Sequence, residues 1–141
     1  MNSSFEKQFS ELQADMISVC LEYCERKSEM IFIHIICENN SVFSNFFFRI
    51  DGIMRKKGRL SDTAAPVSIV RQKEALSIIT KDVREIIGLC EKNGRPMPTE
   101  FKLVYDVAKG SLKSDYSYES VTSSMKSDRV VSEEWFSQQS S

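Results

Sequence analysis

The segment Thr99–Tyr118, TEFKLVYDVAKGSLKSDYSY, places the strongest constraint on the fold. Phe101, Leu103 and Tyr105 alternate with residues of another character, and the same alternation resumes after a short glycine-containing turn. Gly110 suits such a turn because it adopts positive φ without steric cost. The pattern predicts a β-hairpin. Because an isolated hairpin is marginally stable in water, the rest of the chain must supply further strands and covering helices.

Two long amphipathic helices are predicted, one on each side of a group of strands. Apolar residues recur at spacings of three and four from Phe5 to Tyr23, and again within residues 67–93. Pro66 suits the start of the second helix, and Asn93-Gly94 suits its end. Both helices should turn one apolar face toward a sheet.

The strands between these helices are predicted from their β-branched and aromatic residues. Met30–Glu38 is apolar at nearly every position, which is typical of a strand covered on both faces. Val42–Ile50 predicts a second strand that ends at a bend, Asp51-Gly52. Residues 53–54 either extend it or begin a third strand.

The segment after Tyr118 predicts one short helix at most. Val130, Val131, Trp135 and Phe136 have helical spacing, with Ser132 as the cap and Trp135 as an anchor for the segment. The order helix, two or three strands, helix, two strands and optional helix predicts a single α+β domain over residues 1–136. We expect a four- to five-stranded antiparallel sheet with both long helices on one face, in two layers. Residues 137–141 are expected to form a flexible tail.

Composition excludes some classes of protein. The 141 residues carry a net charge of −1, so no overall basic field favours nucleic acid. The first residues lack the basic and apolar regions of a secretory signal, which favours the cytoplasm. No membrane contact is expected, and reduced cysteines are the expectation for such a chain.

The residue types that carry chemistry do not form a recognisable site. His34 is the sole histidine and lies in an apolar strand, where Cys37 points to the opposite face. Cys20 and Cys24 share a helix, but zinc requires four ligands. A dyad of His34 with Cys20, Cys24 or Cys90 stays open, although no nucleophile motif surrounds any of them. We interpret His34 as a hydrogen-bonded sheet residue and assign no catalytic, metal-binding or cofactor-binding residue.

Two surface features remain as candidates. The basic segment Arg55–Arg59 either grips phosphate or an acidic partner, or is simply solvated, and we favour solvation. The hairpin gathers aromatic and acidic residues that suit a protein interface, although its tyrosines are equally consistent with half-burial under a helix. Asp106 and Asp115 could face each other across the hairpin. The candidate partner-binding residues are Tyr105, Asp106, Asp115, Tyr116, Tyr118 and Glu119.

Residues 92–135 also carry a family resemblance. It rests on a long helix ending in Asn-Gly, on Pro98 to Leu103, on Tyr105-Asp106, on the glycine turn, and on Asp115 to Glu119 with a tryptophan near the end. In these features the chain resembles the YezG-like immunity-protein family. The resemblance implies a bacterial cytoplasmic protein, not an enzyme, that neutralises a toxin by binding it stoichiometrically. The implied partner is the C-terminal toxin domain, often a nuclease, of a contact-dependent growth-inhibition or other polymorphic effector.

Two alternatives stay open beside this interpretation. A small secretion chaperone that binds an effector segment shares the size and element order, but needs an exposed hydrophobic groove and is usually a dimer. A nucleic-acid-binding protein would use Arg55–Arg59, whereas the immunity interpretation expects no direct nucleic-acid contact. For the immunity protein a monomer is favoured.

Overall fold

The protein is a single α+β domain built on one antiparallel sheet. The structure, a computed structural model, describes residues 2–140, so Met1 and Ser141 of the predicted domain and tail lie outside it. The sheet has five strands in the order β3-β2-β1-β4-β5. Both the predicted element order and the optional strand and helix are confirmed. The elements are α1 (Asn2–Tyr23), β1 (Met30–Glu38), β2 (Ser41–Ile50), β3 (Ile53–Lys56), α2 (Ile69–Lys92), β4 (Glu100–Asp106), β5 (Ser111–Ser117) and α3 (Asp128–Ser140).

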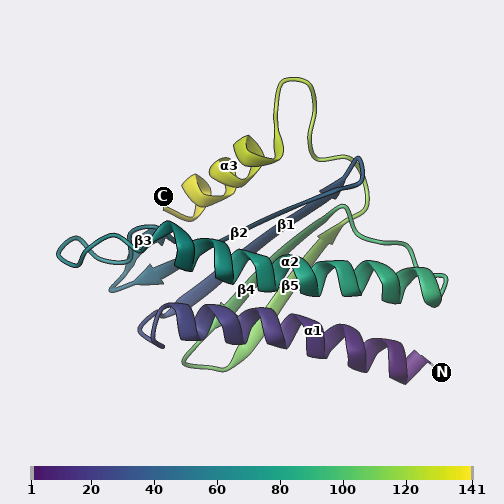
Figure 1. Cartoon of the computed structure of the whole chain (residues 1–141), viewed down its shortest axis with the longest axis horizontal. Helices are drawn as coiled ribbons and strands as arrows, with labels where there is room; N and C mark the ends of the chain where they lie inside the picture. Colours follow the sequence, from purple (N-terminus) through teal and green to yellow (C-terminus); the bar gives the residue numbers. More distant parts are fainter. Residues whose placement is uncertain (1, 141) are drawn as a thin grey trace.

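Helices α1 and α2 lie side by side on one face of the sheet (Figure 1). Alternate residues of the strands enter the core beneath them, including Ile33 of β1, Phe46 of β2 and Leu103 of β4, all fully buried. Burial of these large apolar side chains supplies the main driving force for folding. The central strand β1 is buried on both faces, as its continuous apolar sequence predicts.

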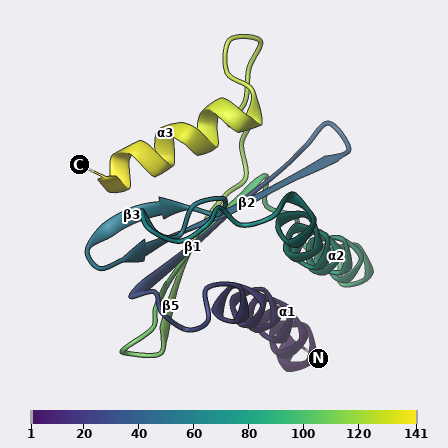
Figure 2. The same cartoon turned by 60° about the vertical axis from the view of Figure 1, so that its left-hand side comes forward.

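Helix α3 lies on the opposite face of the sheet and forms a third layer (Figure 2). The prediction of two layers is wrong in this respect. Phe32 of β1 and Phe47 of β2 point away from α1 and α2, and Trp135 covers both of them. Trp135 is therefore the predicted anchor, with 6% of its surface exposed.

The boundaries of α3 differ from the prediction. Ser132 is not a cap but a buried residue inside the helix, where its hydroxyl accepts a hydrogen bond from Asn45 Nδ2 at 3.0 Å. Ser127 caps the helix instead, since Val130 N–H donates to its Oγ at 3.3 Å. Residues 137–140, predicted to be a tail, are helical, and Arg49 donates to the Gln139 carbonyl at 3.3 Å.

The turns follow the predicted glycine positions. Gly110 adopts φ 62° at the β4–β5 turn, and its N–H donates to the Asp106 carbonyl at 2.8 Å. Gly94 adopts φ 62° directly after α2, where Arg95 N–H donates to the Cys90 carbonyl at 2.9 Å and closes the helix end. Glycine is favoured at both positions because positive φ carries no Cβ penalty.

A buried carboxyl lies where α2 meets α1. Asp82 is 5% exposed, and its Oδ2 has no hydrogen-bond partner among the described residues. Burial, followed by a hydrogen bond and the charge of Asp15, raises the pKa of Asp82 from 3.8 to about 7. Between about pH 4 and pH 7 the folded protein therefore retains a proton here that the unfolded chain has released.

This proton makes the stability depend on pH in a defined direction. Between about pH 4 and pH 7 the folded state binds more protons at Asp82 than the unfolded state, so stability falls as pH rises. Asp82→Asn should remove this slope and exceed the wild type in free energy of unfolding above pH 7 by at least about 1 kcal/mol. Urea titrations at several pH values measure the effect. Glu74→Gln, an exposed change on the same helix, is the control; equal slopes for wild type and Asp82→Asn would contradict the prediction.

Candidate protein-binding site

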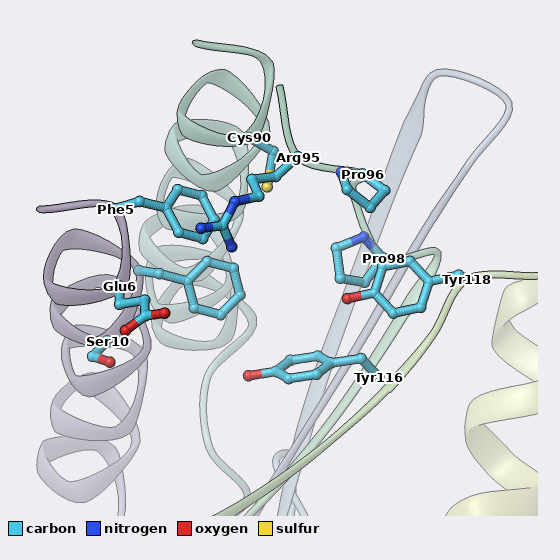
Figure 3. Close-up of a pocket in the computed structure, with 10 residues that line it drawn as sticks. Phe5, Glu6, Ser10, Cys90, Arg95, Pro96, Pro98, Tyr116 and Tyr118 are labelled. Atoms are coloured by element: carbon cyan, nitrogen blue, oxygen red, sulfur yellow. The ribbon is translucent and has the colours of Figure 1, made fainter. Parts of the chain in front are cut away.

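An aromatic pocket opens on the face of the sheet that α1 and α2 cover. It lies between the start of α1, the connection that follows α2, and the end of β5 (Figure 3). Its volume is about 330 Å³. We call it the aromatic pocket and define it by its lining residues: Phe5, Glu6, Phe9, Ser10, Cys90, Arg95, Pro96, Pro98, Tyr116 and Tyr118.

The floor and one wall of the pocket are a set of packed rings. Phe9 of α1 stacks on Phe101 of β4 at 6.2 Å between ring centroids and meets the Tyr116 ring edge-on at 5.9 Å. Tyr116 also meets Phe101 edge-on at 5.3 Å. The Tyr116 hydroxyl accepts a hydrogen bond from Gln13 Nε2 at 2.7 Å. These contacts hold Tyr116 in one orientation while 37% of its surface stays exposed.

The other wall carries one cation. The Arg95 guanidinium lies 4.4 Å from the centre of the Phe5 ring, a cation–π contact that orients it beside the pocket. Glu6 places a carboxylate at the same opening. Burial raises the pKa of the nearby Cys90 thiol, despite the opposing charge of Arg95. The thiol is consequently protonated at neutral pH, and the pocket offers apolar area with one charge of each sign.

The structure brings together only part of the predicted partner-binding set. Tyr116 and Tyr118 both line the aromatic pocket, and Tyr118 is 57% exposed. Tyr105 points to the same face but packs, half-buried, against the main core. Half-burial of the hairpin tyrosines is thus correct for Tyr105, and Tyr116 is covered in part by α1 through Phe9 and Gln13.

The acidic members lie elsewhere. Asp106 and Asp115 do not face each other, since β4 and β5 pair with Lys102 opposite Asp115 and with Ser111 opposite Asp106. A carboxylate of Asp106 instead accepts the Lys109 N–H at 3.0 Å and stabilises the turn. Glu119 is exposed beyond β5, where its carbonyl accepts a hydrogen bond from Thr99 Oγ1 at 2.6 Å.

Of the ten residues that line the aromatic pocket, only Tyr116 and Tyr118 belong to the predicted partner-binding set. Phe5 and Phe9 belong to the apolar stripe of α1, which the sequence predicts to face the sheet, and most of that stripe does pack in the core. Arg95 lies in a connection that the sequence marks only as the end of a helix. The sequence feature that indicates the position of Arg95 is the pair Pro96 and Pro98, because two prolines favour an extended connection after the helix.

The remaining chemical candidates are enclosed. His34 is fully buried under α3, with its Nε2 at 2.7 Å from Glu100 Oε2 and its ring 4.9 Å from that of Trp135. Its Nδ1 has no hydrogen-bond partner within residues 2–140. The prediction of a hydrogen-bonded sheet histidine is confirmed. All four cysteines pack against the core on the other face of the sheet, which separates them from His34 and removes the dyad alternative.

The basic segment is largely engaged in contacts within the chain. Arg55 makes two hydrogen bonds to the Asp62 carboxylate, at 2.7 and 3.0 Å. Lys56 pairs with Glu133 of α3 at 2.9 Å, and Lys57 donates to Asn45 Oδ1 at 2.7 Å. The carboxylates of Asp62 and Glu133 thus offset part of the positive charge of the segment.

Comparisons with known proteins add no assignment. No protein-family model matches the chain, and no curated protein matches it. Within the described residues, no helix is long and apolar enough to cross a bilayer. Residues 2–140 also contain no group of three or more His, Cys, Asp or Glu side chains that could hold a metal ion.

Proposed function

We propose that this chain is an immunity protein that binds and neutralises a cognate bacterial toxin domain. The aromatic pocket carries the proposal, because it is an open apolar hollow at the end of the hairpin where the family resemblance is clearest. Tyr116 and Tyr118, two of the residues predicted from that hairpin, form its exposed side. The proposed action is stoichiometric binding in the cytoplasm, without chemistry by this chain.

The pocket has the character of a protein-binding hot spot. Such sites are enriched in tyrosine and arginine, and they accept an anchoring side chain of the partner. A volume of about 330 Å³ is ample for one aromatic or long aliphatic side chain. Tyr116 is already fixed by Gln13 and Phe9, so little side-chain entropy is lost when a partner covers it.

Charge supports the choice of partner. Nucleases bind a polyanion and therefore present basic surfaces. Glu6 lines the pocket, and Glu119 is exposed just beyond the end of β5. Complementary charge would speed the encounter, and burial of the two tyrosines would slow dissociation. The bound protein then blocks the toxin's substrate or a rearrangement that the toxin needs.

The decisive experiment uses the neighbouring reading frame. If a large secreted protein is encoded directly beside this chain, its last segment should be toxic alone, should co-purify with this chain, and should lose its toxicity on co-expression. A secretion chaperone would instead bind an unfolded effector segment and leave the activity of the folded toxin intact. A toxin that stays fully active in the presence of excess, well-folded protein would refute the proposal.

The exposed tyrosines should contribute measurably to this affinity. Tyr116→Ala and Tyr118→Ala should each weaken toxin binding by at least about 1 kcal/mol, because each removes a ring that the partner would cover. Isothermal titration with the purified toxin domain measures the change. Val130→Ala, at an exposed position of α3 on the other face, is the matched control. Unchanged affinity in both tyrosine variants, with thermal unfolding intact, would remove the aromatic pocket from the interface.

A further inference from the structure

Strand β5 forms an open edge of the sheet. It pairs with β4 on one side and has no strand neighbour on the other, as Figure 1 shows. Most of its residues are exposed, and it contains neither proline nor glycine. At the opposite edge, β3 has only four residues. Protein edges of this kind are usually blunted, because an unpaired strand is a template for another strand.

The hydrogen-bond pattern identifies which backbone groups of β5 face outward. Cys37 N–H donates to the Thr99 carbonyl at 2.7 Å and Val107 N–H to the Glu29 carbonyl at 3.0 Å, so odd-numbered residues along β4 bond to β1. Even-numbered residues of β4 therefore bond to β5, where they lie opposite odd-numbered residues. The N–H and C=O groups of the even-numbered residues of β5 point outward. These are Leu112, Ser114 and Tyr116.

The side chains of β5 are complementary to a second copy of the same strand. If two β5 strands pair antiparallel about a two-fold axis at Ser114, each residue faces the residue of the other copy that lies equally far from Ser114 in the opposite direction. Lys113 then faces Asp115 of the other copy on one side of the sheet. Leu112 faces Tyr116 of the other copy on the other side. Cross-strand pairs of opposite charge and aromatic–aliphatic pairs both stabilise antiparallel sheets.

Three further features favour this register. Leu112 and Tyr116 are among the exposed large apolar residues, at 38% and 37%, and the pairing would cover each with the other. Asp115 already lies opposite Lys102 of β4, so the second copy's Lys113 would extend an alternating row of charges across three strands. Ser114, at the axis, is small enough to face itself without a clash.

We propose that two copies of this chain associate through their β5 edges, in the antiparallel register centred on Ser114, to form one continuous sheet. The outward groups of Leu112, Ser114 and Tyr116 form about six hydrogen bonds between the copies. This self-complementary contact has the isologous form of two-fold dimers. It is small, so we expect a dissociation constant in the micromolar range rather than a permanent dimer.

The dimer and the proposed toxin contact share Tyr116, which lines the aromatic pocket and would face Leu112 of the other copy, so the second copy and the toxin would compete for it. The proposed dimer differs from the monomer favoured from the sequence, and joining two sheet edges does not by itself favour a secretion chaperone. Tyr118 lies beyond the last residue of β5 and outside the ladder, which allows the two contacts to be tested separately. Sedimentation of the protein alone tests the dimer, whereas toxin binding by Tyr118→Ala tests the aromatic pocket.

Reversal of the two charges gives the sharpest test. K113D or D115K alone places like charges opposite each other twice in the dimer, and each should weaken association roughly tenfold or more by sedimentation velocity. The double variant K113D/D115K restores both pairs and should associate as the wild type does. An equimolar mixture of the two single variants should form mixed dimers, because one supplies two anions and the other two cations. K109D, in the exposed turn outside the ladder, should have no effect.

A backbone substitution tests the same association without changing any charge. It also leaves unchanged Asp115, the residue that lies opposite Lys102 of β4. Ser114→Pro removes an outward N–H without removing a bond to β4, and proline is tolerated at sheet edges in that orientation. It should abolish association while thermal unfolding stays close to that of Ser114→Ala, which keeps the N–H and should associate normally. A wild type that stays monomeric up to about 200 µM, far above a micromolar dissociation constant, would overturn the proposal. Association that survives both Ser114→Pro and the single charge reversals would overturn it equally.

Discussion

Trp135→Ala should lower the free energy of unfolding by about 3 to 5 kcal/mol, the range for truncation of a large buried aromatic residue. The indole is the main contact between α3 and the sheet, with ring centroids 5.8 Å from Phe32 and 5.2 Å from Phe47. Its loss would leave a cavity and expose two phenylalanines. It would also remove the ring over which the Lys102 ammonium lies, 5.6 Å from the centroid.

Urea denaturation followed by circular dichroism measures this loss, with Val130→Ala as the exposed control on the same helix. Hydrogen exchange adds a second readout, because the amides of α3 should lose protection before those of β1. A loss below about 1 kcal/mol for Trp135→Ala would mean that α3 contributes little to the stability of the domain.

Glu100→Ala should also be costly, at about 1 to 3 kcal/mol, because it leaves the buried Nε2 of His34 without its hydrogen-bond partner. The Glu100 side chain is 7% exposed and that of His34 is fully buried, with 2.7 Å between Oε2 and Nε2. Ser117 Oγ donates to the other carboxylate oxygen at 3.3 Å. Glu100→Gln keeps most of the volume and an amide that can hydrogen-bond, so its loss should be clearly smaller.

The same pair predicts a sensitivity to acid. Burial alone would raise the pKa of Glu100, but the hydrogen bond and charge of His34, with Lys102 and Ser117, outweigh it and hold the pKa below the ordinary 4.5. The folded state therefore binds fewer protons than the unfolded state, and stability falls as pH drops from about 4.5 through the lowered pKa. Urea titrations should show a steeper acid loss for the wild type than for Glu100→Gln; parallel curves would contradict this.

Local patterns allowed most of the fold to be predicted from the sequence. The alternation in residues 99–118 predicts β4 and β5 correctly. The two period-two patterns are separated by a turn that contains Gly110, a residue that adopts positive φ readily. The predicted Met30–Glu38 matches the observed strand. The apolar spacing and Asn93-Gly94 place α2 to within two residues at its start and one at its end.

The arrangement of the layers could not be predicted in the same way. The strand β1 is apolar on both faces, so its sequence shows that both are covered but not by which helix. The side chains that decide the position of α3, Trp135 against Phe32 and Phe47, meet only in three dimensions. Serine favours the cap position, so the local sequence predicts Ser132 as a cap, whereas tertiary contact with Asn45 places it inside a longer helix.

The candidate site likewise contains residues that could be predicted from local sequence and residues that come together only in the folded protein. Tyr116 and Tyr118 could be found from the hairpin, because strand alternation and aromatic character are local. Phe5 and Arg95 could not, since the pocket exists only where the start of α1 and the connection after α2 meet the end of β5. The register of the hairpin determines where the acidic residues lie. The four-residue turn places Asp115 opposite Lys102 and not opposite Asp106.

The burial of the sole tryptophan under α3 has a practical consequence for spectroscopy. Its fluorescence originates on one side of the sheet, beside His34, while three of the four tyrosines lie on the hairpin and its continuation. Fluorescence excited selectively from the indole thus reports whether α3 is packed on the sheet. Absorbance of the phenols follows events at the hairpin, so one unlabelled sample carries a separate optical signal for each side of the protein.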